Sequence, residues 1–233
     1  MLASELFKMI EARVPMELAL STDTVGFIGP GNPETIEVNK VLVVLDYHHE
    51  LELEDWDLVV SHHPPLVKPN IPTYVIHSNW DIVQGGANDA LAESLKIKVL
   101  DVFDTKTGIG RICSADILLE DFLINVADVL KTEQLNVVRK DDGHIGKLAI
   151  VSGFGLNPEY IQLAYDKGVD LFLSGDLTHK GALTAIKLGI FVVDATHQAT
   201  EVPGLIRLCR LISEFGLTVE FEYPQMPWEF YVK

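Results

Sequence analysis

A histidine and a glutamate four residues apart are the first sign of chemistry in this sequence. They stand in His197-Gln-Ala-Thr-Glu201, directly after the apolar run Ile190-Phe-Val-Val-Asp194. Imidazole and carboxylate groups are ligands of first-row metal ions. If a helix begins near residues 198–200, the two side chains lie on one face and can converge on one ion, and Pro203 falls in the first turn, whose amides lack helical acceptors. Helices carry such pairs on solvated faces at least as often, so the pair needs partners elsewhere in the chain.

Two adjacent histidines far upstream are candidate partners. His62 and His63 follow the apolar run Asp57-Leu-Val-Val-Ser61, and Pro64 and Pro65 follow them. Successive side chains of an extended segment point to opposite faces, so the pair can address two ions. The first proline also keeps His63 out of helical geometry. The alternative is a pair of histidines on a solvent-exposed loop. The pattern favours a dinuclear centre.

Further polar residues follow other predicted strands. Asp81 comes four residues after His77, at the end of Thr73-Tyr-Val-Ile-His77, and before Gly85-Gly86. Asp81 can bind an ion directly, whereas His77 can orient a ligand by hydrogen bonding or be an ordinary buried histidine. Asp176 and His179 follow a strand ending at Ser174 and are candidates for acid, base or substrate contacts. Their alternative is a turn followed by a helix cap.

A second histidine pair competes with the first. His48 and His49, together with Asp46, also follow a strand, but no proline stiffens this segment, so we rank the cluster lower. The sequence has no Walker A loop, no GxSxG motif and no arrangement of a nucleophilic cysteine. Gly153-Phe-Gly155 after a strand could bring amides near a phosphate, but it is too short to identify a nucleotide site.

The elements that position these residues alternate between strands and helices. Apolar runs at 40–46, 57–61, 147–152 and 170–174 predict strands buried on both faces, and helical spacing covers 4–13, 120–131 and 158–167. A further strand is expected at 110–117 and another at 135–139. Two similar halves of βαβ type would face each other across a cleft, where sheet folds commonly bind ligands. We therefore expect an α/β fold with the metal site between the halves.

Composition excludes several classes of function. The chain has 233 residues and a net charge of −16, with 18 Lys and Arg residues, which argues against nucleic-acid binding. The two cysteines, Cys113 and Cys209, are too few for a disulfide framework, so we expect an intracellular, cytoplasmic protein. The start of the chain is interrupted by acidic residues, unlike a signal peptide, and no run is long and apolar enough to span a membrane.

Taken together, these motifs resemble the NGG-interacting-factor-three-like dinuclear metal proteins, also called GTP cyclohydrolase I type 2 homologues. The resemblance covers nearly the whole chain. The motifs that carry it are Ser21-Thr-Asp-Thr-Val-Gly26, Ser61-His-His-Pro64, His77-Ser-Asn-Trp-Asp81, Gly85-Gly-Ala-Asn-Asp-Ala-Leu91, Ser174-Gly-Asp176 with His179, and Asp194-Ala-Thr-His197 with Thr200-Glu201. The sequence departs from the family at Thr196, where glycine is usual, and at Lys180, where a second histidine is common. It also lacks the large insertion domain of some relatives.

The resemblance implies a single dinuclear metal-centre domain over residues 1–233, with one lobe formed by 1–105 and the C-terminal end and the other by 106–200. It implies two divalent ions per subunit, with Glu201 as the bridging carboxylate, and assembly into a toroidal homohexamer. Zinc, iron, manganese, cobalt and nickel all suit such ligands. The implied ligands are His62, His63, Asp81, His197 and Glu201.

The function that follows is a dinuclear metal-dependent hydrolase acting on a small molecule. By resemblance, the substrate is GTP: hydroxide adds at C8 of the purine and formate leaves, with His179 or His77 as proton donor and Asp176 as a further catalytic candidate. Two alternatives remain open. One is a two-metal phosphoester or amide hydrolase; the other is a regulatory or interaction protein whose metal serves assembly or metal handling.

Overall fold

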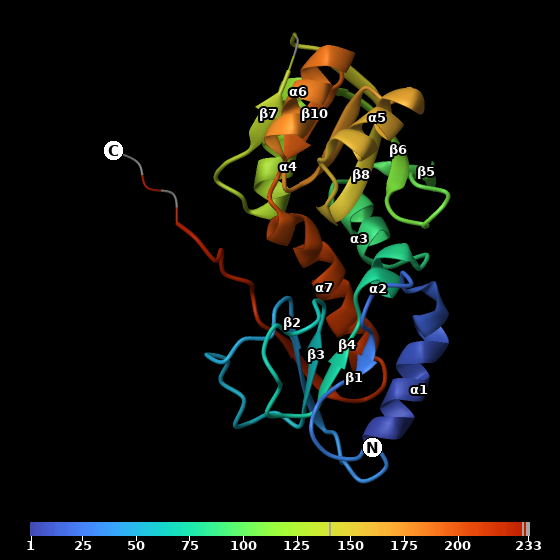
Figure 1. Ribbon diagram of the computed structural model, residues 1–233, viewed down its shortest axis with the longest axis vertical. Coiled ribbons are helices and arrows are strands. Elements are labelled where there is room, and N and C mark those ends of the chain that lie inside the picture. The colour runs from blue at the N-terminus through green and yellow to red at the C-terminus, as the bar shows by residue number, and fades with distance from the viewer. Residues whose placement is uncertain (140, 230, 232–233) are drawn as a thin grey trace.

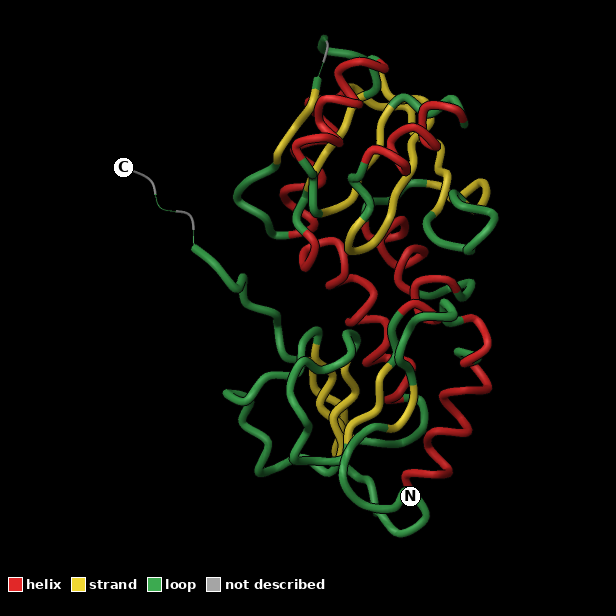
Figure 2. Tube along the Cα trace, viewed as in Figure 1, coloured by secondary structure: helices red, strands yellow, loops and turns green. Residues whose placement is uncertain are grey.

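The protein is a mixed α/β molecule with two sheets. The structure, a computed structural model, describes residues 1–139, 141–229 and 231. Its strands are β1 (Gly26–Phe27), β2 (Lys40–Val44), β3 (Leu58–Ser61), β4 (Thr73–Val75), β5 (Lys98–Val102), β6 (Arg111–Leu118), β7 (Asn136–Val138), β8 (His144–Phe154), β9 (Leu171–Gly175), β10 (Phe191–Asp194) and β11 (Thr218–Phe221). Its helices are α1 (Ala3–Arg13), α2 (Ser78–Ile82), α3 (Ala87–Ser94), α4 (Leu119–Leu130), α5 (Pro158–Asp166), α6 (His179–Leu188) and α7 (His197–Ser213), with a 3-10 turn η1 (Met16–Leu18). Figures 1 and 2 show two separate groups of strands with helices between them.

The first sheet has the order β1-β4-β3-β2-β11. Strands β11, β2, β3 and β4 run parallel, and β1 is antiparallel to β4. The predicted strands at 40–46 and 57–61 are confirmed as β2 and β3, whose apolar side chains are buried on both faces. Helix α1 covers this sheet with its apolar stripe: Ala3, Leu6, Phe7 and Ile10 are buried at helical spacing in the same core.

The second sheet has the order β5-β6-β8-β9-β10-β7. Its central strands β8, β9 and β10 are parallel, while β5, β6 and β7 pair antiparallel with their neighbours. Helix α4 packs in the core on one face, through Phe122 and Val126, and α5 and α6 pack on the other, through Ile161 and Ala185. Strand β5 lies before the predicted lobe boundary at residue 105, yet it hydrogen-bonds to β6 in this sheet.

Helix α7 connects the two sheets. It begins directly after β10 and ends shortly before β11, and Figure 1 shows it crossing from one group of strands to the other. Ala199 near its start is buried in a core of the second sheet, whereas Leu205, Leu208 and Ile212 are buried in the core of the first. Burying a leucine side chain contributes roughly 1.5–3 kcal/mol, so this face of the helix holds the two sheets together.

The start of α7 differs from the sequence-based expectation. Thr196 is the N-cap and its side chain accepts a hydrogen bond from the Ala199 amide, so the helix begins at His197 and not at 198–200. Pro203 therefore lies inside the helix, beyond its first turn, where it removes one helical hydrogen bond. The earlier start places His197 and Glu201 on successive turns of one helix.

Buried polar contacts also join segments from different parts of the chain. Arg111 on β6 makes an ion pair with Asp89 of α3 at 2.8 Å and donates to the backbone carbonyls of Ile82 and Val83. The Trp80 indole donates to the Gly204 carbonyl of α7 at 3.2 Å. These contacts join α2 and α3 to strand β6 of the second sheet and to helix α7. In the part of the chain that the structure describes, no helix is long and apolar enough to cross a membrane.

Candidate metal centre

The five predicted ligands come together in the structure. His62 and His63 directly follow β3, Asp81 lies in α2, and His197 and Glu201 lie in the first turns of α7. His62 and Glu201 are almost completely buried, while His63, Asp81 and His197 keep a minor part of their side chains exposed. Because β3 and β10 both end here, side chains from the two sheets meet at the carboxyl ends of parallel strands.

The Glu201 carboxylate lies between two groups of side chains. Its Oε1 is 3.4 Å from His62 Nε2, and its Oε2 is 3.3 Å from both His63 Nε2 and His197 Nε2. Asp81 Oδ1 approaches His62 Nε2 to 3.7 Å. One half of the centre thus contains His62, Asp81 and Oε1 of Glu201, and the other contains His63, His197 and Oε2. Ligand atoms of His63, His197 and Glu201 all lie within 4.8 Å of one another.

The centre contains buried polar atoms without hydrogen bonds. His62 Nε2, Asp81 Oδ1 and Glu201 Oε2 are all buried and none has a hydrogen-bond partner. Each buried polar atom without a hydrogen bond lowers the free energy of unfolding by about 1–3 kcal/mol. An imidazole nitrogen and two carboxylate oxygens in one place are donors that a divalent cation accepts. The donor set therefore fits a metal ion.

The outward nitrogen of each predicted histidine ligand is fixed by a hydrogen bond. His62 Nδ1 donates to the Ile76 carbonyl at 2.8 Å, His63 Nδ1 to Asp46 at 2.8 Å and His197 Nδ1 to Asp176 at 2.7 Å. A proton on Nδ1 leaves the lone pair of Nε2 directed into the centre, which is the arrangement of metal-binding histidines. Asp176, considered above as a catalytic group, therefore holds His197 in position.

His77 forms a similar pair beside the centre. Its Nδ1 lies 2.8 Å from Asp23 Oδ1, and Asp23 also accepts hydrogen bonds from the amide and hydroxyl of Ser78. The His77 ring lies 5.2 Å from that of His62 and 5.4 Å from that of His63, measured between centroids. One ring nitrogen from each of these three histidines lies within 4.8 Å of the others. Sequence reasoning missed Asp23, although it lies in the Ser21–Gly26 motif.

The ionisable groups of the centre perturb one another strongly. Burial lowers the pKa of His63 and His197, but hydrogen bonds with carboxylates outweigh it and raise each pKa to about 10. Burial raises the pKa of Asp81 to about 7. Burial also opposes ionisation of Glu201, yet the surrounding histidines hold its pKa well below the ordinary value. The Nε2 atoms of His63 and His197 are 3.2 Å apart, so without an ion they can share one proton.

A glycine on β8 makes room for the centre. A Cβ atom at Gly153 would lie 2.3 Å from Glu201 Oε1 and 3.2 Å from His197 Nε2. The backbone of Gly153 also has a φ of +76°, which disfavours other residues. Its amide donates to the Thr200 hydroxyl at 2.9 Å. Close approach of β8 to α7 at the Glu201 carboxylate therefore requires glycine here.

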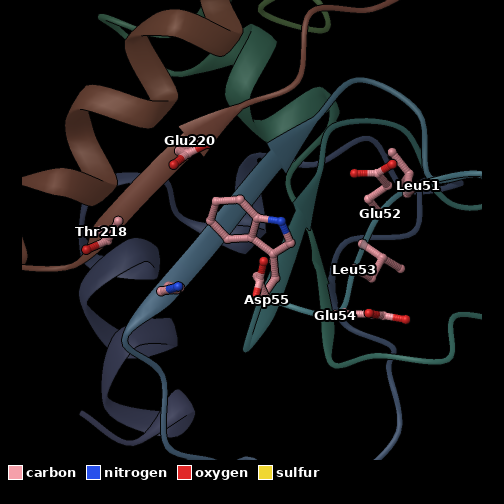
Figure 3. Close-up of a pocket in the computed structure, with 9 residues that line it drawn as sticks. Leu51, Glu52, Leu53, Glu54, Asp55, Thr218 and Glu220 are labelled. Carbon is pink, nitrogen blue, oxygen red and sulfur yellow. The ribbon is translucent and has the colours of Figure 1, made fainter.

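A hollow gives access to one side of the centre. The metal-facing hollow, as we call it, has a volume of about 270 Å³ and is lined by Leu45, Asp46, His63, Asp176, His197, Gln198, Met226, Pro227 and Trp228. The last three belong to the segment that follows β11. A larger hollow of about 780 Å³ lies elsewhere, between β11 and the loop 51–56, and none of the five predicted ligands lines it. Figure 3 shows that second hollow, with Glu52, Glu54 and Glu220 around it.

Other candidates from the sequence lie apart from the centre. His48 and His49 are exposed on the turn that follows β2. His179 is exposed at the first residue of α6, and among the described residues no hydrogen bond or ion pair of its ring is present. The expected turn and helix cap at this point is formed by Thr178, whose side chain accepts from the Gly181 amide.

Comparison with known proteins shows which family the chain comes from. The family model described as Duf34/NIF3 (NGG1p interacting factor 3) matches residues 1–70 and 65–226. The chain belongs to the Duf34/NIF3 family. A relative named GTP cyclohydrolase 1 type 2 homolog, from Methanothermobacter thermautotrophicus, is 43% identical over 97% of this chain and 94% of its own length. The resemblance stated from the sequence is thereby confirmed.

Solved structures of Duf34/NIF3 relatives have the same fold. Reduced HcgD from Methanocaldococcus jannaschii is 31% identical and superposes with a TM-score of 0.83, covering 95% of this chain and 97% of its own. A Bacillus cereus protein related to NIF3 is 19% identical, with a TM-score of 0.83 over 99% of each chain. The α/β fold expected from the sequence is therefore confirmed.

Thr196 is an unusual residue for its place in this Duf34/NIF3 chain. Its backbone has φ 69° and ψ 151°, a region that is essentially restricted to glycine. A β-branched residue here is strained, which explains physically why glycine suits this position. Two local hydrogen bonds hold the threonine: its amide donates to Asp194 Oδ1 at 2.9 Å, and its hydroxyl accepts from Ala199.

Proposed function

We propose that this protein is a dinuclear metal-dependent hydrolase that opens the imidazole ring of a purine nucleotide, with GTP as the substrate to test first. The observation that carries the proposal is the position of Glu201. Each oxygen of its buried carboxylate lies within 3.4 Å of a histidine Nε2, and the histidines belong to two different groups. A carboxylate in that position can bind two cations at once, one through each oxygen.

In this proposal His62, Asp81 and Glu201 hold one divalent ion, and His63, His197 and Glu201 hold the other. Bound divalent ions would supply Lewis acidity and a lower pKa for water at the centre. Nitrogen and oxygen ligands of this kind suit zinc, iron, manganese, cobalt or nickel. Asp46 and Asp176 keep the rings of His63 and His197 in the orientation that binding needs.

His77 is the proposed base. Burial and the nearby charge of His62 lower its pKa, so its ring is neutral at pH 7 and its second nitrogen can accept a proton. Burial acts against the charge on Asp23, but hydrogen bonds from His77 and Ser78 keep the Asp23 pKa low. A charged Asp23 stabilises His77 once it is protonated, as a carboxylate does for other catalytic histidines. His179 is exposed at the start of α6, apart from the centre, whereas a ring nitrogen of His77 lies within 4.8 Å of ring nitrogens of His62 and His63, so we assign the proton transfer to His77.

The substrate part of the proposal rests on relatives and on the hollow. Relatives over most of the chain are named GTP cyclohydrolase 1 type 2 homolog. The metal-facing hollow, about 270 Å³ in volume and bordered by Trp228, has the size of a planar heteroaromatic ring with space for water. Addition of water at C8 breaks one C–N bond of the imidazole ring, and a second water releases C8 as formate. A proton taken up by His77 goes to the nitrogen that leaves.

The experiment is to measure formate released from GTP by protein loaded in turn with each candidate metal. We expect release by the wild type, loss in His77→Asn with its metal content retained, and no effect of His144→Ala. His144 is a good control because it is paired with Asp116 on the surface. Full metal occupancy without formate in any metal would refute the proposed reaction. Turnover of a phosphoester under the same conditions would favour a two-metal phosphoesterase, and turnover of neither would favour a metal-binding regulatory protein.

Two further parts of the proposal concern the protein in the cell. A homohexamer with its centres facing the interior is expected from the family resemblance, and a cytoplasmic location is expected from the low cysteine content. Light scattering of the purified protein tests the first, and fractionation of the source cells tests the second.

A further inference from the structure

The segment after β11 forms one wall of a continuous groove along α7. In Figure 1 this segment (red) leaves the first sheet and runs toward the level of the second. Beside the metal-facing hollow lies a middle hollow of about 350 Å³, and the two share Gln198, Met226 and Trp228. Next comes a distal hollow of about 460 Å³, which shares Leu130, Lys131, Val202 and Tyr223 with the middle one. The three hollows are therefore neighbours, in order, from the metal centre outward.

The two ends of this groove differ in chemistry. At the metal-facing end lies Trp228, an aromatic residue that is 55% exposed. At the distal end, the hollow is lined by three basic residues, Lys131, Arg207 and Arg210, and by one carboxylate, Glu93. Arg207 is paired with Glu93, whereas Lys131 and Arg210 make no ion pair among the described residues. The chain has 18 basic and 34 acidic residues and is therefore acidic as a whole. Two unpaired cations that line one hollow differ from this acidic background and favour an anionic ligand.

The middle hollow combines apolar side chains, among them Leu130, Val202 and Met226, with a polar group. Thr132, Glu133 and Gln134 line it, and Glu133 has no ion-pair partner among the described residues. A carboxylate accepts hydrogen bonds from hydroxyl groups but repels phosphate. This part of the groove therefore suits a sugar, with an anionic group farther along.

The length of the groove matches the same class of ligand. Helix α7 rises by about 18 Å between Gln198, at the metal-facing end, and Arg210, at the distal end. An extended nucleoside triphosphate has this length scale. Ring, sugar and phosphates would meet, in that order, an aromatic face, a hydroxyl acceptor and two cations.

We propose that this groove is the binding site of a nucleoside triphosphate, with its base against Trp228 beside the metal centre and its phosphates at Lys131 and Arg210. The identity of the ligand class rests on the proposed function, but the roles of the three residues do not require turnover. Trp228 and the two cations are specificity-determining residues that recognise opposite ends of one ligand.

The test is equilibrium binding of GTP and of guanosine to the metal-loaded protein by calorimetry. We expect Lys131→Gln with Arg210→Gln to weaken GTP binding by about tenfold, through loss of charge-assisted contacts, and to leave guanosine binding unchanged. Trp228→Ala should weaken both ligands by about tenfold, and Trp228→Phe should keep most of the affinity. The matched control is Lys8→Gln with Lys187→Gln, which removes the same charge from exposed helix positions.

Inorganic tripolyphosphate should compete with GTP for the wild type and not for the Lys131/Arg210 variant. Unchanged GTP binding in that variant, or an equal loss of GTP and guanosine, would overturn the inference. Because the readout is binding, it is separate from the proposed reaction. GTP that binds in this way without releasing formate contradicts only the reaction, and formate release by a variant with unaltered GTP affinity contradicts only the groove.

Discussion

Replacement of Gly153 by alanine is the sharpest test of the geometry at Glu201. The new Cβ would lie 2.3 Å from Glu201 Oε1, whereas ordinary contacts begin at 3.4 Å, so the carboxylate must move by about 1 Å. The left-handed backbone adds about 1–2 kcal/mol of strain, and overpacking a buried site typically adds 1–3 kcal/mol. A displaced Glu201 carboxylate would no longer lie between the two groups of histidines and could not bind an ion in each half of the centre. We therefore expect both lower stability and loss of metal binding.

A matched control separates these two effects. Gly168 has a φ of +64° and nothing within 4 Å of its would-be Cβ, so Gly168→Ala carries the backbone strain alone. In a chain of this size 1 kcal/mol shifts Tm by roughly 2–4 °C. Without metal, we expect Gly168→Ala to melt a few degrees below the wild type and Gly153→Ala lower still.

Thermal unfolding with and without added metal completes the assay. An ion at 100 times its Kd raises stability by about 2.7 kcal/mol, and the wild type and Gly168→Ala should both show that increase in Tm. Gly153→Ala should show none. If Gly153→Ala gains as much from the metal as Gly168→Ala does, the assignment of Glu201 to the metal centre fails.

The remaining predictions concern the groups around the ligands. Asp46→Asn and Asp176→Asn should each weaken metal binding by about 10–100-fold, because each carboxylate orients a histidine ligand. The control Asp116→Asn, which alters an exposed pair with a histidine on β8, should leave metal binding unchanged. Equal effects of all three substitutions in a metal titration would contradict this role of Asp46 and Asp176. Metal affinity should rise from pH 6 to pH 9, because the raised pKa values of His63 and His197, about 10 each against an ordinary 6.5, mean that a proton competes with the ion throughout this range. Proton release on metal addition, followed with an indicator dye in weak buffer, checks this, and an affinity that does not change with pH would speak against it. Replacing the strained threonine at position 196 with glycine should raise the free energy of unfolding by about 1 kcal/mol, since relief of strain exceeds the few tenths lost from the cap; a lower midpoint in urea would show that the threonine is not strained.

The fold could be predicted largely because its strands are buried on both faces. The apolar runs at 147–152 and 170–174 became β8 and β9, as predicted, since parallel strands covered by helices have no polar face. The start of α7 was less predictable. The capping side chain of Thr196 sets it, and only the structure reveals that this residue adopts a positive φ.

The candidate site could be predicted in its inner residues but not in the groups that orient them. Adjacency in the sequence groups Asp46 with His48 and His49. Its partner is decided by sheet register: β2 pairs with β3 so that Val44 lies opposite Ser61, and two residues farther along Asp46 meets His63. Asp176 meets the start of α7 for the same reason, since Ser174 pairs with Asp194. Such pairings depend on strand order, which the chain's local patterns do not encode.

The most direct test of the account is the number of metal ions bound per chain, measured by elemental analysis of the wild type and of Glu201→Gln. A carboxylate shared by two ions predicts two ions per chain in the wild type and loss of both in the variant, because each half of the centre loses one of its oxygen ligands. The neutral amide keeps the size of the side chain, so the fold should survive and circular dichroism should confirm it. A variant that is folded and still holds two ions, or a wild type that holds only one under saturating metal, would contradict the shared centre.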